Sequence, residues 1–163
     1  MSENNAIMQG GSVAESCVLQ ISDLHKSYGS HPVLEGVSFS IPRGKIVGLL
    51  GPNGCGKSTI MKMISGLLPA DNGSILIDGH LPGLVSKSIV SYLPERTYLN
   101  DWMKVSEVLQ FFSDFYADFD LERAQQMLAD LHLSPNTRLK TMSKGTKEKV
   151  QLILVMSRRA QLY

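Results

Sequence analysis

Residues 46–50 form an apolar run, Ile-Val-Gly-Leu-Leu, in which no polar residue alternates with the hydrophobic ones. A strand that other layers cover on both faces shows this pattern, so the run predicts the central strand of a parallel sheet. Shorter apolar segments at residues 18–21 and 33–41 are separated by the turn-forming residues 29–32. They predict antiparallel strands beside the central one.

Two more strands are expected after the central run. Residues 74–77 lead into the turn pair Asp78-Gly79, and residues 89–93 stop at Pro94, which cannot donate to a strand ladder. The short apolar segment at residues 60–64 is interpreted as a helix. This alternation of strand and helix predicts an α/β fold.

From residue 95 onward the spacing of apolar residues becomes helical. Residues 105–116 and 121–131 carry them on one helical face, and Asp120 is a candidate N-cap for the second segment. A last helix is predicted to start near Ser143, with its second half buried because residues 150–156 are apolar on nearly all sides. Five aromatic side chains are interpreted as core of this helical part, rather than as a groove for a partner helix: Phe111, Phe112, Phe115, Tyr116 and Phe119.

The central run leads directly into the most informative chemistry of the chain. Residues 51–58 read G-P-N-G-C-G-K-S, the pattern of a phosphate-binding P-loop, between a predicted strand and a predicted helix. The glycines let backbone N–H groups point at a polyphosphate, and the helix adds the positive end of its dipole. Lys57 supplies a fixed charge for the β- and γ-phosphates, and Ser58 supplies a hydroxyl oxygen for Mg²⁺.

Composition limits the other possibilities. The 163-residue chain has 16 Lys plus Arg against 15 Asp plus Glu, so its charge gives no reason to expect a nucleic-acid partner. Cys17 and Cys55 are too few for a disulfide framework, which favours a reducing cytosolic compartment. No stretch approaches the roughly 20 apolar residues that span a bilayer, and the N-terminus lacks the basic start of a signal peptide. We expect other chains to cross any membrane at which this protein works.

A P-loop alone is compatible with kinases, GTPases, helicases and transport ATPases, but three further segments narrow the choice. Lys26-Ser27-Tyr28-Gly29 resembles the adenine-stacking aromatic turn of ATP-binding cassette (ABC) proteins, and residues 75–79 resemble their strand and turn after the P-loop. Residues 139–150, LKTMSKGTKEKV, resemble the family's L-S-G-G-Q signature and the helix that it opens. By this resemblance the chain is identified as an ABC transporter nucleotide-binding subunit, more like the antibiotic and multidrug exporters than the sugar importers.

The resemblance implies an α/β fold in which a P-loop NTPase core carries an antiparallel β subdomain and a small α-helical subdomain. Residues 1–16 are expected to be a flexible tail, and residues 17–163 a partial ABC ATP-binding domain. Within it, residues 17–94 would form the nucleotide-binding core and residues 95–157 the helical subdomain with the signature. Residues 158–163 would start the Walker B strand, which in the family ends in a metal-binding aspartate and a catalytic glutamate.

The resemblance also implies roles for individual residues. Tyr28 would stack on adenine, and Val33 would touch its other edge. Ser143, Lys144 and Gly145 would close over the γ-phosphate held by a second copy of the domain. The residues expected to wrap the phosphates are Gly51, Pro52, Asn53, Gly54, Cys55, Gly56, Lys57, Ser58 and Thr59.

The chain departs from the family pattern at several positions. Lys144 and Thr146 replace a glycine and the glutamine of the signature. Glu95 stands where the family usually carries a glutamine that links the magnesium site to the helical insert; with Ser58, it would contact Mg²⁺. The catalytic residues are expected beyond Tyr163, so residues 1–163 by themselves are expected to bind ATP without hydrolysing it.

The implied cofactors are ATP and Mg²⁺, and the implied partners are a second ABC ATPase domain and integral membrane subunits. Those subunits would hold the chain on the inner face of the cell membrane. Two alternatives stay open: an ATP-binding module that does not hydrolyse its ligand, and a soluble ABC ATPase with no role in transport. A GTPase is disfavoured because the chain has no N-K-x-D motif.

Overall fold

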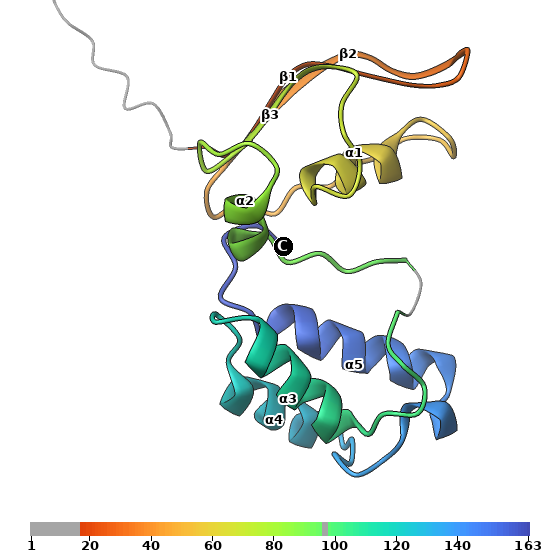
Figure 1. Cartoon of the computed structure of the whole chain (residues 1–163), viewed down its shortest axis with the longest axis vertical. Helices are drawn as coiled ribbons and strands as arrows, with labels where there is room; N and C mark the ends of the chain where they lie inside the picture. The colour runs from red at the N-terminus through yellow and green to blue at the C-terminus, as the bar shows by residue number, and fades with distance from the viewer. Residues whose placement is uncertain (1–16, 96–97) are drawn as a thin grey trace, which may run out of the picture.

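A three-stranded antiparallel sheet forms the first of two lobes in the computed structural model, which describes residues 17–95 and 98–163 (Figure 1). β1 (Cys17–Tyr28) lies in the centre, between β2 (His31–Pro42) and β3 (Asn72–Ile77). The strands predicted around residues 18–21, 33–41 and 74–77 are confirmed. The tail predicted at residues 1–16 lies outside the described residues.

Helix α1 (Lys57–Ile64) packs on this sheet through Ile60 and Met63, which are both buried. The helix begins with the last residues of the P-loop motif, so the same contact that buries its apolar face also fixes the loop before it. Strand residues complete the core of the lobe: Val18, Leu19, Ile21, Leu24, Leu34, Ile75 and Ile77.

The predicted central strand at residues 46–50 is wrong for the described structure. These residues are irregular, and the side chains of Ile46 and Leu50 are almost fully exposed. A strand needs neighbouring strands to pair its N–H and C=O groups, and no strand of the described residues pairs with this segment. The apolar run therefore has the composition of a buried strand without the neighbours that would make it one.

The strand predicted at residues 89–93 is wrong for the same reason. Ile89 ends helix α2 (Leu84–Ile89), and Val90 makes only an isolated parallel bridge to Leu162. The sequence pattern missed α2 because its apolar residues Leu84 and Val85 are exposed and give no buried stripe.

The second lobe is helical, as predicted, and consists of α3 (Val105–Phe115), α4 (Leu121–Asp130), a short 3-10 helix (Leu139–Thr141) and α5 (Lys144–Met156). Its caps confirm the sequence reading. The Asp120 side chain accepts a hydrogen bond from the backbone N–H of Arg123, and Ser143 caps α5. The core of the lobe contains Val105, Val108, Leu109, Phe112, Ala124, Leu128, Leu139, Val150, Ile153 and Leu154.

The interpretation of the aromatic residues as core is only partly correct. Phe112 is buried, and Tyr116 and Phe119 pack against the core. Phe111 and Phe115 are instead 56% and 68% exposed and stack on each other, with 6.1 Å between ring centroids. These two residues lie one turn apart on the outward face of α3, so their spacing is helical but their side is the wrong one for the core.

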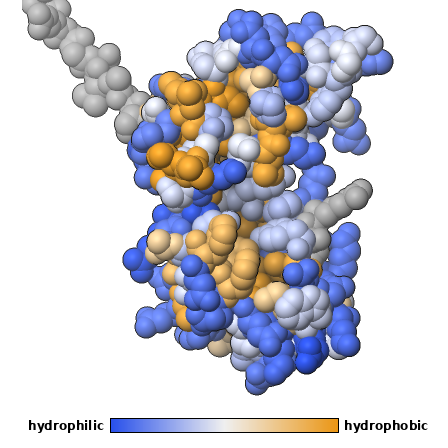
Figure 2. Space-filling model, viewed as in Figure 1, coloured by the Kyte–Doolittle hydropathy of each residue, from blue (hydrophilic) through white to orange (hydrophobic). Residues whose placement is uncertain are grey.

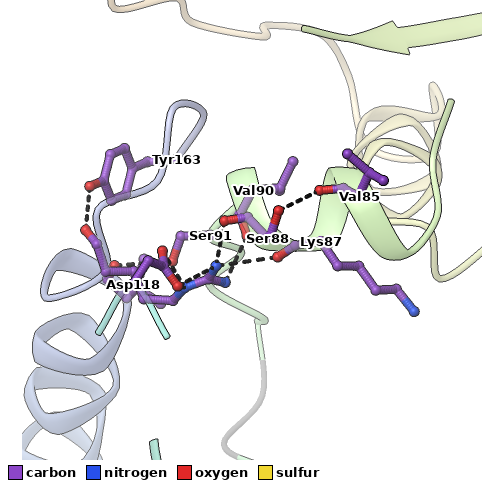
Figure 3. A network of polar contacts seen from close by, with 9 residues as sticks. Val85, Lys87, Ser88, Val90, Ser91, Asp118 and Tyr163 are labelled. Carbon is purple, nitrogen blue, oxygen red and sulfur yellow. Dashed lines mark hydrogen bonds and ion pairs between the residues drawn. The ribbon is translucent and has the colours of Figure 1, made fainter. Parts of the chain in front are cut away.

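Arg158 joins the two lobes, and its side chain is only 5% exposed. Figure 3 labels four residues to which it bonds, Asp118, Val90, Ser88 and Lys87. Nε donates to both carboxylate oxygens of Asp118 at 3.1 Å, while Nη1 donates to the carbonyl of Val90 at 2.9 Å. Nη2 donates to the carbonyls of Ser88 at 2.9 Å and Lys87 at 3.3 Å. The end of α2 in the first lobe and the α3–α4 connection in the second therefore share one buried cation.

Replacing Arg158 by Met is expected to lower the free energy of unfolding by about 3–5 kcal/mol, because it leaves Asp118 and the α2 carbonyls without their buried partner. Urea denaturation followed by circular dichroism measures the loss. Arg158→Lys is the matched control. It keeps the positive charge, but an ammonium cannot form the bonds that the planar guanidinium makes to Asp118 and the α2 carbonyls together. Its stability is therefore expected to lie between those of Arg158→Met and the wild type. Wild-type stability in Arg158→Met would contradict the assigned role.

Candidate functional site

The P-loop runs from Gly51 into the first turn of α1. Gly56 is the N-cap of the helix and has φ of 92°, a left-handed conformation that favours glycine. A Cβ at this position would lie 2.6 Å from the side chain of Leu34 and 3.2 Å from the carbonyl oxygen of Val33. The start of β2 therefore presses against the loop, and only glycine leaves room for it.

Lys57 lies over the loop that precedes it. Its Nζ donates to the carbonyl oxygens of Gly51 at 2.8 Å and Pro52 at 2.7 Å. The first turn of α1 holds no acidic residue, so no side chain of that turn cancels the positive end of the helix dipole. An ammonium, a helix N-terminus and a glycine-rich turn are thus gathered at one place, which suits a polyphosphate.

Ser58 and Glu95 meet beside the P-loop, although 37 residues separate them along the chain. The Ser58 hydroxyl donates to Oε1 of Glu95 at 2.7 Å. Burial, and secondarily the negative charge of Glu95, raise the pKa of the neighbouring Tyr92. The structure therefore brings together the two residues that the sequence assigned to magnesium.

The chemistry of this pair fits Mg²⁺. Both side chains offer hard oxygen atoms, and Mg²⁺ is commonly held by one or two protein oxygens together with the phosphates of a substrate. Within residues 17–95 and 98–163 no cluster of three His, Cys, Asp or Glu side chains could hold a metal without such help.

Tyr28 and Val33 belong to the β1–β2 hairpin, whose tip reaches beyond β3 over the P-loop side of α1 (Figure 1). Tyr28 is the last residue of β1, lies opposite His31 and is 50% exposed. Val33 Cγ1 comes within 3.2 Å of the Cβ position of Gly56. The hairpin thus places Val33 at the loop and leaves a tyrosine ring accessible at its tip.

The signature residues lie at the start of α5, in the helical lobe. The Ser143 hydroxyl accepts a hydrogen bond from the backbone N–H of Thr146 at 3.2 Å, so within this chain it serves as an N-cap. The side chain of Lys144 is 88% exposed. Glu95 lines a cavity of about 460 Å³ with Lys144 and another of about 400 Å³ with Gly145. Glu95 is therefore the residue that both the P-loop side and the signature side share.

A cavity of about 550 Å³ opens between the two lobes, and the sequence reading did not foresee it. One wall comes from the first lobe and α2 and includes Lys62, Leu67 and Lys87, while the other comes from the helical lobe and includes Tyr98 and Phe115. Figure 2 shows apolar side chains at the surface of both lobes. We call this cavity the interlobe groove.

No helix within the described residues is long and apolar enough to cross a membrane.

Comparison with known proteins identifies the family. The ABC transporter family profile matches residues 34–163. The SkfA peptide export ATP-binding protein SkfE of Bacillus subtilis (strain 168) is 36% identical over 152 residues, which are 90% of this chain and 64% of that protein. The linearmycin resistance ATP-binding protein LnrL of the same organism is 32% identical over 89% of this chain and 49% of its own length. This chain thus spans about half to two thirds of the length of these relatives.

The fold indicates the same family. A solved structure described as the ATP-binding subunit of an ABC transporter superposes with a TM-score of 0.76 at 31% identity, over 85% of this chain and 61% of that one. This likeness confirms the predicted fold class, a P-loop ABC ATPase with an antiparallel sheet and a helical part. The profile match, the relatives and this structural likeness together show that the chain belongs to the ATP-binding subunits of ABC transporters.

Proposed function

We propose that the protein binds ATP with Mg²⁺ and that two such domains, closing on two nucleotides, drive export through separate membrane subunits. The observation that carries the proposal is the convergence of Lys57, Ser58 and Glu95 at the P-loop. The export direction is supported by the relatives, whose names refer to peptide export and linearmycin resistance. The membrane subunits would hold the protein on the inner face of the cell membrane.

Each residue of the proposed site has a distinct task. The Lys57 ammonium, now bonded to two carbonyls, would turn to the β- and γ-phosphate oxygens, and the N–H groups of residues 51–59 would bind the remaining phosphate oxygens. Ser58 and Glu95 would hold Mg²⁺, which neutralises phosphate charge when it is bound. Tyr28 would stack on adenine, with Val33 at its edge.

Glu95 is positioned to relay the state of the nucleotide. It follows α2 and leads toward α3, so it lies on the segment that connects the two lobes. The hydroxyl that it accepts from belongs to the P-loop helix. If a nucleotide and its metal occupy Ser58, that bond must be replaced and the connecting segment must adjust. The helical lobe, with Ser143, Lys144 and Gly145 at its α5 N-terminus, would thereby be presented to the partner domain's nucleotide.

The interlobe groove is the proposed docking surface for the membrane subunits. Exposed Leu67 and Phe115 offer apolar contacts, and Lys62 and Lys87 place positive charge at its walls. A cytoplasmic helix with apolar and acidic residues would complement it. Because the walls of the groove come from both lobes, a change in the relative position of the lobes would change the contacts of a partner bound there.

The proposal divides the chain at residue 94. Residues 17–94 would act as the nucleotide-binding core, residues 95–157 as the signature-bearing subdomain, and residues 158–163 as the approach to a Walker B strand. The separate hydrophobic cores of the two lobes support this division. The parallel bridge between Val90 and Leu162 supports the last assignment, since it places residue 162 in strand-like register beside residue 90.

Lys57→Ala and Tyr28→Ala are expected to weaken nucleotide binding in different ways. Loss of the Lys57 charge should lower affinity for ATP far more than for adenosine, because it acts on the phosphates. Loss of the Tyr28 ring should cost about 1–3 kcal/mol with ATP, ADP and adenosine alike. Isothermal titration with the three ligands distinguishes the two patterns. Equal losses with adenosine in both variants would contradict the assignments.

Glu95→Gln tests the metal contact. The variant is expected to shift the magnesium dependence of ATP affinity while leaving metal-free nucleotide binding nearly unchanged, because it removes one charged oxygen ligand. Titration with MgCl₂ at fixed ATP, compared with Glu122→Gln as a matched exposed control on α4, gives the readout. An unchanged magnesium profile would return Glu95 to an ordinary loop carboxylate.

A polypeptide of residues 1–163 alone is expected to bind ATP without turning it over. Hydrolysis needs a group that positions the attacking water, and the family resemblance assigns that role to no residue between 1 and 163. Losing such a group commonly lowers the rate by about 10²–10⁴. Steady-state phosphate release, with Lys57→Ala as the blank, measures the rate of ATP hydrolysis by this polypeptide. Lys57-dependent turnover of about one per minute would show that a residue of this chain completes the site.

A further inference from the structure

Among the strands of residues 17–95 and 98–163, the end of β1 that carries Tyr28 has a neighbour on one side only. Pairing with β3 extends to His25, which lies opposite Asn72, whereas pairing with β2 continues to Tyr28. Even on the β2 side, Ser27 faces Pro32, which has no N–H to donate. The last three residues of β1 are therefore paired with β2 but have no partner in β3.

Asp71 supplies the missing neighbour. Its backbone N–H donates to the carbonyl of His25 at 3.1 Å. One carboxylate oxygen accepts the backbone N–H of Ser27 at 2.7 Å, and the other accepts Nζ of Lys26 at 2.6 Å. Three consecutive residues directly before Tyr28 are thus bonded to one aspartate, which extends the edge of the sheet by main-chain and side-chain bonds.

The ion pair with Lys26 is the strongest part of this arrangement. The Lys26 side chain is only 10% exposed, and a buried ammonium requires a counter-charge to remain there. The hydrogen bond from Lys26, and then the one from the Ser27 N–H, hold the pKa of Asp71 below its usual range. Both bonds are therefore made to the charged carboxylate.

We propose that Asp71, acting through Lys26 and Ser27, is a positioning residue for Tyr28 and so determines how tightly the site holds the base of its nucleotide. The inference rests on the proposed stacking of Tyr28 on adenine. Stacking depends on the position of the ring, and the ring is carried by a hairpin tip that Asp71 alone ties to the β3 side among the contacts described for residues 26–28. Loss of this tie leaves the phosphate-binding groups of the P-loop in place.

The test compares Asp71→Asn with wild type by isothermal titration against ATP, ADP, adenosine and tripolyphosphate. Asparagine can still accept from Ser27 but cannot neutralise Lys26. Affinity for the three adenine ligands is expected to fall by the same factor, about three- to tenfold, a fraction of a full stacking loss. Affinity for tripolyphosphate, which has no base, is expected to stay unchanged. A general loss of folded structure would lower all four.

Asp120→Asn is the matched control, since Asp120 is also a carboxylate paired with a basic side chain, in this case Arg159 near the helical lobe. It is expected to leave all four affinities unchanged. Lys26→Met is the second variant, should Asp71→Asn fold poorly. It removes the buried charge while keeping the bond from Ser27 to Asp71, and it is expected to give a smaller loss with the same ligand pattern.

The double variant Tyr28→Ala/Asp71→Asn decides whether Asp71 acts through the ring. If it does, Asp71→Asn causes no further loss of adenosine affinity once Tyr28 is gone. A further loss equal to that in the wild-type background would overturn the inference, as would unchanged adenine affinity in Asp71→Asn. If Tyr28→Ala binds adenosine as tightly as the wild type, the proposed adenine contact is wrong, and the inference about Asp71 is wrong with it. If Tyr28→Ala weakens adenosine binding but Asp71→Asn does not, only the inference about Asp71 is wrong.

Discussion

One buried guanidinium bonds to both lobes. Arg158 binds Asp118 in the helical lobe and three carbonyls at the end of α2, and it lies 4.0 Å from the centre of the Tyr116 ring. A cation removed from water in this way is stable only when its donors find acceptors in fixed directions. These bonds therefore constrain how the end of α2 lies toward the α3–α4 connection. The interlobe groove, which Arg158 lines, depends on this constraint.

The bond between Ser58 and Glu95 connects the P-loop helix to the segment between the lobes in a different way. Its atoms are exposed oxygen atoms that suit a metal and a phosphate, so a ligand can replace it. The structure thus combines buried hydrogen bonds at Arg158 with an exposed, exchangeable hydrogen bond at Glu95. In the proposed function, this difference lets the nucleotide act on the helical lobe while the contacts of Arg158 stay in place.

Local patterns correctly predicted the elements whose conformation depends on a few adjacent residues. The P-loop glycines, the Asp120 and Ser143 caps and the helical spacing of α3, α4 and α5 are all properties of a few adjacent residues, and each was found where the sequence placed it. The pattern failed where it recorded only hydrophobicity. Residues 46–50 are apolar but have no paired neighbour, and Phe115 has helical spacing but lies on the exposed face.

The sequence by itself determined the family, the position of the P-loop motif and most secondary structure, because periodicity, caps and motifs are local. Only the tertiary structure decided which polar groups meet. Ser58 is hydrogen-bonded to Glu95, which is 37 residues away in the sequence. Lys26 bonds to Asp71 at a separation of 45 residues, and Arg158 bonds to the carbonyl of Val90 at a separation of 68. Many charged residues of the chain could form such pairs equally well on local grounds. The packing of the sheet and helices makes the choice, because it brings these few groups within bonding distance.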